Sequence, residues 1–296
     1  MLHVATVMAP REVFRLKQSH ADSIAEALKS LGRKPLSVTW LGEQSAFDLT
    51  FEGKAARDHE ILASAGLRSF PVDVVVQPLA GRAKTLFIAD MDSTIICEEC
   101  IDEIADVLGL KEKVAAITEA AMHGKLDFKT ALKKRVSLLK GISRAQLQAV
   151  YQDRITTAPG ARTLIKTLKS AGIQTALVSG GFTFFTDQVK DALGFDFVRA
   201  NQLGFSGDRL DGTVKEPLMD ARGKKDFLEE LAKGSPQAVL AIGDGANDIP
   251  MFRAAGMSLA YHGKPVAEKA ARARLTHVDL TGVLYTLGIM EKAFQR

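Results

Sequence analysis

The chain has 296 residues, of which 46% are hydrophobic and 25% are charged, which is typical of a folded protein large enough for two domains. Its 39 basic and 35 acidic residues leave a formal net charge of +4, too small an excess to indicate a nucleic-acid-binding protein. No apolar run reaches the roughly 18 residues of a membrane span and no secretory signal is evident, so we expect a cytoplasmic protein without membrane contact.

The first 80 residues predict a small domain of alternating strands and helices. We expect strands at 2–8, 36–41, 46–51 and 72–76, with helices at 19–31 and 55–65. This βαββαβ order is the split βαβ arrangement of ferredoxin-like folds. It resembles ACT domains, which sense small molecules, but no residue pattern marks a ligand site. A sensing role and a structural role that joins two copies into a homodimer are both open.

A different architecture is expected after a linker at 78–84. Buried strands at 85–89, 173–178 and 238–242 are accompanied by helices such as 161–170 and 224–232. Alternating strands and helices predict a Rossmann-like α/β fold with a parallel sheet. We therefore expect two domains, at 1–80 and 81–296.

The first two strands of the second domain are separated by a long segment. It predicts four helices, at 100–109, 113–124, 128–141 and 144–153, whereas a crossover between parallel strands needs only about a dozen residues. We interpret the segment from about 97 to 156 as a helical cap inserted into the core domain.

Polar residues follow each of the three buried strands. The first strand runs into ADMDST and the second into SGG, while GDGAND follows the third. Because ligands of open α/β sheets bind outside the carboxyl ends of the strands, these loops should meet at one site. The side chains and backbone groups of interest there are Asp90, Asp92, Ser179, Gly180, Asp244, Asn247 and Asp248.

The four carboxylates of these loops indicate a metal site. Asp90 and Asp92 are two residues apart at a strand end, a spacing that points both side chains the same way. An Asp-x-Asp pair alone is a weak signal, but Asp244 and Asp248 add two acids among glycines. Oxygen ligands of this kind suit Mg²⁺.

Two further groups indicate an anionic ligand at the same place. Ser179 and the glycines after it offer a hydroxyl and free N–H donors for phosphate oxygens, and Lys224 is a candidate cation at the start of a helix. Most lysines are solvated surface charges, so Lys224 alone carries little weight. Together, the loops predict a site for a metal and a phosphate.

The order of these motifs resembles that of the haloacid dehalogenase superfamily of phosphotransferases, over residues 84 to about 290. DMDST, a strand ending in Ser179, Lys224 and GDGAND stand in the order of the superfamily's four motifs. Within it, the chain is most similar to the phosphoserine phosphatase family. The resemblance includes Glu99 after DMDST, the segment ITEAAMHGKLDFKTALKKRVSLLKG, LVSGGF and GDGANDIPM.

The resemblance implies a role for each motif residue. Asp90 would be the nucleophile and Asp92 the general acid and base. Mg²⁺ would be held by Asp90, the backbone carbonyl of Asp92 and Asp244, with Asp248 in support. The phosphoryl oxygens would be bound by Ser179, Gly180, Lys224 and Asn247.

In the cap, the resemblance implies the groups that select the substrate. Glu99 would receive an ammonium group and Arg135 a carboxylate. Met122 and Phe128 would close the pocket against water, although ordinary helix packing explains them nearly as well. The implied reaction is Mg²⁺-dependent hydrolysis of O-phospho-L-serine through an aspartyl phosphate, the last step of serine biosynthesis.

Three other interpretations stay open. The chain could act on another small phosphate such as phosphohomoserine, or it could be a regulatory protein that senses phosphorylation of an aspartate. The Cys97–Cys100 pair could instead mark a redox or zinc module. A structural zinc site needs about four ligands and the chain has no second cysteine pair, but the position near a helix start fits a redox motif.

Overall fold

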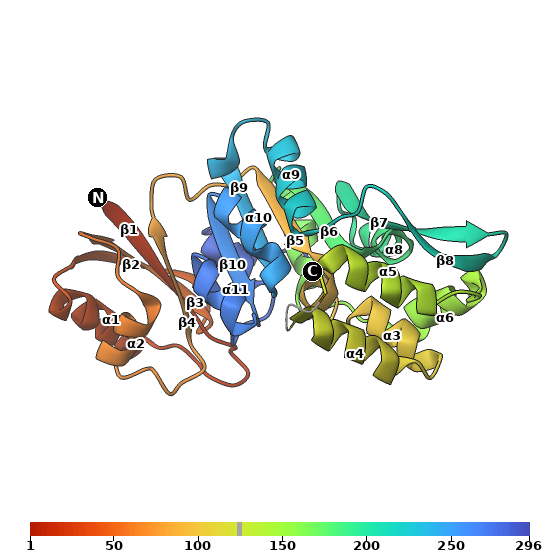
Figure 1. Ribbon diagram of the computed structural model, residues 1–296. Coiled ribbons are helices and arrows are strands. Elements are labelled where there is room, and N and C mark those ends of the chain that lie inside the picture. Colours follow the sequence, from red (N-terminus) through yellow and green to blue (C-terminus); the bar gives the residue numbers. More distant parts are fainter. Residues whose placement is uncertain (123–125) are drawn as a thin grey trace.

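The computed structural model describes residues 1–122 and 126–296. It contains two β-sheets, and the smaller sheet belongs to the N-terminal part of the chain. One hydrophobic cluster lies within that part, whereas the largest cluster joins Met8, Leu41, Ala46 and Val75 to the core of the larger sheet. Figure 1 shows this part at one end of the molecule, the larger sheet in the middle, and helices α3 to α6 at the far end. None of the helices in the described ranges is long and apolar enough to cross a bilayer.

The N-terminal part has the predicted βαββαβ order. Its sheet is antiparallel with strand order β2-β3-β1-β4. Helix α1 is amphipathic, because its buried residues Ala21, Ile24, Ala27 and Leu28 recur at helical spacing. The elements are β1 (Leu2–Met8), α1 (Gln18–Ser30), β2 (Lys34–Gly42), β3 (Ala46–Glu52), α2 (Asp58–Ser64) and β4 (Asp73–Pro78).

The larger sheet has seven strands in the order β11-β10-β9-β5-β6-β7-β8. Neighbouring strands are parallel except β7 and β8, which form an antiparallel hairpin, so the expected parallel sheet is in fact mixed. Its strands are β5 (Leu86–Asp90), β6 (Gln174–Phe182), β7 (Phe197–Ser206), β8 (Arg209–Lys215), β9 (Val239–Gly243), β10 (Met257–Tyr261) and β11 (Ala273–Leu275).

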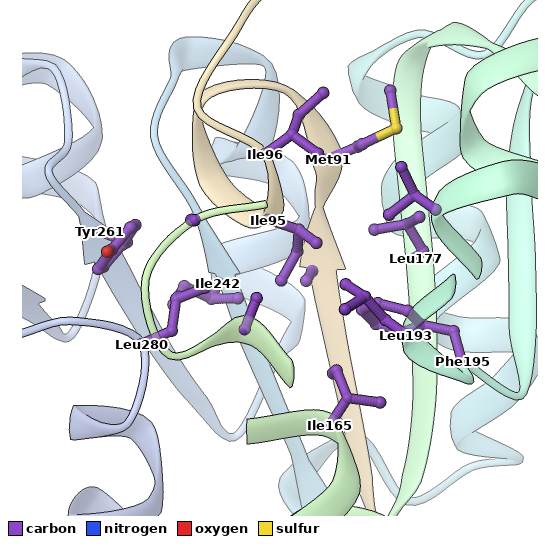
Figure 2. Close-up of a cluster of buried hydrophobic side chains, with 14 of the residues drawn as sticks. Met91, Ile95, Ile96, Ile165, Leu177, Leu193, Phe195, Ile242, Tyr261 and Leu280 are labelled. Atoms are coloured by element: carbon purple, nitrogen blue, oxygen red, sulfur yellow. The ribbon is translucent and has the colours of Figure 1, made fainter. Parts of the chain in front are cut away.

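Helices cover both faces of this sheet and bury its apolar strands. Every residue of β5 and β9 is buried, as expected for central parallel strands. Figure 2 shows Ile165, Leu177 and Ile242 gathered beside β5 in the larger core. The helices are α7 (Ala161–Ser170), α8 (Thr183–Leu193), α9 (Ala221–Ala232), α10 (Ile249–Ala254), α11 (Pro265–Ala270) and α12 (Gly282–Thr286).

The segment between β5 and α7 forms the four expected helices. They are α3 (Cys100–Val107), α4 (Lys111–Met122), α5 (Phe128–Leu138) and α6 (Arg144–Arg154), and we call them the cap. The expected second helix extended to residue 124, and residues 123 and 124 lie outside the described ranges. Asp127 and Ser143 begin α5 and α6 by accepting hydrogen bonds from backbone N–H groups in the first turn.

The β7–β8 hairpin, which the sequence did not predict, joins the cap to the core sheet. Gly141 N donates to Leu210 O and Leu210 N donates to Ile142 O, both at 2.8 Å, and Arg144 N donates to Asp208 O at 2.9 Å. Because β7 also pairs with β6, the hairpin runs directly from the core into the cap.

Arg82, in the predicted linker, fastens the N-terminal part to the rest of the chain. Its guanidinium donates to both Asp48 carboxylate oxygens, at 2.6 and 2.9 Å, and to the Thr6 hydroxyl. It also donates to the carbonyl oxygens of Tyr285 and Thr286. The Arg82 and Asp48 side chains are only 12% and 8% exposed, so this ion pair is well shielded from water.

We expect Arg82→Met to lower the free energy of unfolding by about 3 kcal/mol, because it leaves the Asp48 carboxylate buried without its partner. Equilibrium urea denaturation measures the loss, and Arg82→Met combined with Asp48→Leu should recover part of it. Arg199→Met, which removes an exposed pair with Glu230, is the matched control and should change little. Equal losses in Arg82→Met and Arg199→Met would contradict this account.

Candidate active site

The three predicted loops meet at one edge of the larger sheet. Asp90 pairs in register with Val178, the residue before Ser179, and Ala89 pairs with Ile242 near the end of β9. The carboxyl ends of β5, β6 and β9 therefore lie side by side, as the sequence predicted. This register brings the side chains that follow the strands into contact.

Lys224 lies between two of the carboxylates. Its Nζ is 2.6 Å from Asp90 Oδ2 and 2.7 Å from Asp248 Oδ1, and all three side chains are buried. Burial alone lowers the pKa of the Lys224 ammonium, but the charges of Asp248 and Asp90 outweigh it, so the net shift is upward. Lys224 therefore stays charged and offsets part of the negative charge at the site.

Asp248 also holds the loop after β9. Its Oδ2 accepts hydrogen bonds from the backbone N–H groups of Asp244 and Gly245, both at 3.1 Å. A Cβ on Gly243 would come within 2.3 Å of the same oxygen, so only glycine allows this close approach. The loop sequence GDGAND thus fixes the carboxylate of Asp248 against its own backbone.

The side chains of Asp90, Asp244 and Asp248 form a cluster that can hold a metal ion. One carboxylate oxygen from each lies within 4.8 Å of the others, and all three residues are buried. Burial raises the pKa of Asp90 well above its usual value, and the charge of Asp248 adds to the effect, while Lys224 opposes it. A divalent cation would relieve this repulsion through the oxygen ligands it prefers.

The carboxylate of Asp92 faces a different set of partners. Its Oδ1 accepts from Cys100 N at 2.9 Å and its Oδ2 accepts from Ser179 Oγ at 2.7 Å. Asp92 lies in a tight turn after β5, in which Ser93 adopts a left-handed backbone with φ of 53°. Its carboxylate is therefore hydrogen-bonded to the first residue of α3 and to the end of β6.

Glu99 and Arg135 lie on the cap side of the site. Glu99 is the residue before α3 and accepts a hydrogen bond from Ser93 Oγ at 3.0 Å. Burial, followed by the charge of Asp92, raises the pKa of Glu99 to about 7. Arg135 projects from α5, and its Nε is buried without a hydrogen-bond partner in the described part of the protein. An unpaired guanidinium nitrogen of this kind is a ready donor to an anion.

Three further predicted site residues are Asn247, Phe128 and Met122. Asn247 Nδ2 lies 3.4 Å from Asp90 Oδ2, which brings this amide into the site. The Phe128 ring lies next to Gly180, 3.6 Å from the position of a Cβ there, so the cap touches the end of β6. Met122 is the last residue of α4, but its side chain lies outside the described part of the structure.

Lys264 is a site residue that sequence reasoning missed. Its Nζ is 2.9 Å from Asp244 Oδ2, and its backbone N–H donates to Asp244 O at 2.8 Å. It follows β10, the strand next to β9, so the rule that ligand sites lie beyond strand ends could have found it. The strand itself was not predicted.

The geometry argues against a redox role for the cysteine pair. Both thiols are free, and Cys100 is buried. Burial, with the charge of Asp92, raises the pKa of Cys100 well above its usual value, whereas a reactive thiol needs a lowered pKa. Among the described residues, the cluster that could hold a metal contains aspartates alone.

Comparison with known proteins identifies the family. The sequence model of the haloacid dehalogenase-like hydrolase family matches residues 84–256. The chain belongs to the haloacid dehalogenase-like hydrolase family. The matched range includes β5, the cap and the loop after β9, so the family covers every residue of the cluster described above.

Three relatives of this hydrolase extend the comparison. A phosphoserine phosphatase from Polaromonas is 46% identical over 203 residues, which make up 66% of this chain and 86% of that protein. The structure of a probable phosphoserine phosphatase from Vibrio cholerae, in an unliganded form, is 30% identical with a TM-score of 0.78. It covers 98% of this chain and 88% of the other, so the likeness includes the N-terminal sheet.

A third structure carries an analogue of a reaction intermediate. It is a phospho-aspartyl intermediate analogue of phosphoserine phosphatase, 40% identical with a TM-score of 0.64. The match covers 68% of this chain and 98% of that one. The likeness shows that this hydrolase shares its fold with a protein that uses a phosphorylated aspartate.

We expect Asp244→Asn to weaken the binding of a divalent cation by at least about tenfold, because it removes a charged oxygen ligand from the cluster. Calorimetric titration with Mn²⁺ measures the affinity. Asp191→Asn, at a position whose side chain is 79% exposed, is the control and should bind Mn²⁺ like the wild type. An unchanged affinity in Asp244→Asn would remove this aspartate from the metal site.

Proposed function

We propose that this hydrolase cleaves O-phospho-L-serine to L-serine and inorganic phosphate, the last step of serine biosynthesis, with Mg²⁺ as its cofactor. The observation that carries the proposal is the pair of strand-end aspartates with different partners, Asp90 against Lys224 and Asp92 against Ser179. The identity to phosphoserine phosphatases supports the choice of substrate. The proposal also divides the chain into domains 1–80 and 81–296, with the cap at about 97–156.

Asp90 is the nucleophile in this scheme. A carboxylate oxygen of Asp90 attacks phosphorus, the bond to the serine oxygen breaks, and an aspartyl phosphate forms. The buried carboxylates of Asp90 and Asp244 and the backbone carbonyl of Asp92 would hold Mg²⁺, with Asp248 in support. When bound, the metal neutralises charge that would otherwise repel the anionic phosphate from the aspartate.

Asp92 is the general acid and base. It gives its proton to the leaving serine oxygen, and in the second step it takes a proton from the water that attacks the aspartyl phosphate. The hydrogen bonds from Cys100 N and Ser179 Oγ fix the orientation of its carboxyl group. The same residue therefore serves both steps, and the protein returns to its starting protonation state.

The phosphoryl oxygens are bound by groups that surround the two aspartates. Ser179 Oγ, the Gly180 N–H, the Lys224 ammonium and the Asn247 amide are donors at the ends of β6 and β9 and on α9. Phosphoryl transfer depends mostly on positioning and electrostatic stabilisation, so these groups matter as much as the nucleophile. Their placement on rigid elements supports this role.

The cap selects a zwitterionic substrate. Glu99 offers a carboxylate to the ammonium group, and Arg135 offers its unpaired Nε to the carboxylate. A sugar phosphate has neither group and would leave both charges without partners. Phe128 lies over Gly180 and shields the reacting phosphate from water.

Phosphate release from O-phospho-L-serine tests the proposal. We expect release that requires Mg²⁺, that EDTA abolishes, and that Asp90→Asn reduces by at least about a thousandfold, because the amide is not a nucleophile. Phosphohomoserine and glucose 6-phosphate are the comparison substrates, and both should have lower kcat/KM. Undiminished release by Asp90→Asn would overturn the mechanism, and a better comparison substrate would overturn the choice of substrate.

The pKa of Glu99 predicts a pH dependence of substrate binding. Because this pKa is raised to about 7, the carboxylate is charged above that pH and neutral below it. The KM for O-phospho-L-serine should therefore rise as the pH falls through about 7, and Glu99→Gln should have a high KM at every pH. Phosphate titration contributes near the same pH, so the wild type is compared with Glu99→Gln on the same substrate. Parallel profiles for the two proteins would exclude Glu99 as the ammonium receptor.

A further inference from the structure

Asn201 is a buried polar residue of β7 with no role in the chemistry above. It is 1% exposed, and its amide makes three hydrogen bonds to the backbone of two other segments. Nδ2 donates to Gly180 O at 2.8 Å and to Met219 O at 3.2 Å, and Oδ1 accepts from Met219 N at 2.7 Å. One side chain therefore connects the end of β6 with the segment that leads into α9.

The first of these bonds fixes one peptide group at the end of β6, beside the proposed phosphate-binding residue Ser179. The carbonyl of the peptide between Gly180 and Gly181 accepts from Asn201, and its N–H donates to Ser179 Oγ at 2.8 Å. With both ends held, this peptide cannot rotate without breaking a buried hydrogen bond. The Ser179 hydroxyl in turn donates to Asp92 Oδ2. A continuous chain of hydrogen bonds thus runs from Asn201 to the general acid.

The two bonds to Met219 fix the segment before α9. Asp220 follows directly and begins this helix, since its Oδ1 accepts from Gly223 N at 2.9 Å, and Lys224 lies in the first turn. The Asn201 side-chain amide bonds to both the N–H and the carbonyl of Met219, as a residue of a neighbouring strand would. Asn201 therefore sets the distance between the Gly180 peptide and the helix that carries the Lys224 ammonium.

Asn201 also lies at the point where β7 changes partners. It is the last residue of β7 in register with β6, opposite Phe182, and Gln202 begins the pairing with β8. Beyond it the hairpin continues to the cap. The amide thus occupies the junction of the core sheet, the hairpin and the site.

We propose that Asn201 is a positioning residue that holds the Gly180 peptide, the Ser179 hydroxyl and Lys224 in the arrangement that binds the phosphoryl group. This proposal rests on the proposed function, in which those three groups bind phosphate. Asn201 acts through them and does not touch the substrate. None of its hydrogen bonds reaches Asp90, Asp244 or Asp248, so it acts on the metal site only through Lys224, which contacts Asp90 and Asp248. We therefore expect Asn201 to affect phosphate binding more than metal binding.

Binding of inorganic phosphate to the Mg²⁺-loaded protein tests the proposal. Asn201→Asp keeps the volume and the acceptor for Met219 N but replaces the donor nitrogen with oxygen, and Asn201→Ala removes all three bonds. By calorimetry, we expect each variant to bind phosphate more weakly by on the order of tenfold to a hundredfold, because small misplacements of binding groups have effects of this size. Affinity for Mg²⁺ should fall much less than affinity for phosphate, because Asn201 contacts none of the three aspartates and reaches two of them only through Lys224.

Thr175→Val is the matched control. Thr175 is buried on β6, and its hydroxyl donates to Asp196 Oδ2 at 2.9 Å, at the end of the strand away from the site. This variant should lose thermal stability but bind phosphate normally, which separates positioning from general loosening of the sheet. All proteins are compared below the midpoint of thermal unfolding of the least stable variant.

Normal phosphate affinity in either folded Asn201 variant would overturn the proposal. So would an equal loss of phosphate affinity in Thr175→Val, or a loss of Mg²⁺ affinity as large as that for phosphate. Inorganic phosphate is the product whatever phosphate monoester is the substrate, so these results do not depend on phosphoserine. Failure of the substrate assignment would appear instead in the comparison of phosphate esters.

Discussion

The arrangement of this site depends on the repulsion between buried carboxylates at the ends of β5 and β9. Asp90, Asp244 and Asp248 bring three acidic groups within 4.8 Å, and the buried ammonium of Lys224 contacts two of them. Lys264 contacts the third, Asp244, from a more exposed position, and two cations do not neutralise three anions in a poorly solvated cluster. The cluster therefore favours a divalent metal ion, and with the metal in place it can accept the negative charge of a phosphate group. The local sequence fits this arrangement, since Gly243 leaves room for the Asp248 carboxylate, which accepts from the backbone N–H groups of Asp244 and Gly245.

Different elements of the fold hold the groups that surround the metal-binding cluster. Asp92 is not part of the metal-binding cluster and accepts hydrogen bonds from Ser179 and Cys100, which suits the proton-carrying role that we propose for it. The cap contributes charges of both signs through Glu99 and Arg135, and the β7–β8 hairpin ties the cap to the core sheet. The N-terminal sheet lies at the opposite end of the molecule from the cap (Figure 1), and Arg82 connects it to the segment at Tyr285.

Much of the candidate site was predictable because its polar residues stand in short segments at the ends of buried strands. The strand ending at Asp90, the apolar part of β6 and the loop GDGAND could be placed from apolar runs alone, and the register of parallel strands then brings them together. The expected end of the second strand before Ser179 was wrong, because β6 continues through Gly180 and Gly181 to Phe182. The β7–β8 hairpin could not, because residues 197–215 mix polar and apolar side chains without a clear alternation. Arg82 and Asn201 were missed for another reason. Each acts through hydrogen bonds to segments distant in the sequence, and a single residue in a linker or strand carries no local signal of such partners. Lys264 could have been identified only from the position of β10, and that strand was not predicted.

The central claim is that Asp90 becomes covalently phosphorylated during turnover. The most direct measurement is acid quenching of the Mg²⁺-loaded protein within the first turnovers of O-phospho-L-serine, followed by mass spectrometry of its peptides. The account predicts a phosphoryl group on the peptide that contains Asp90, present during turnover and lost once the substrate is exhausted. A phosphoryl group on another residue, or turnover with an unmodified Asp90 at every quench time, would contradict it.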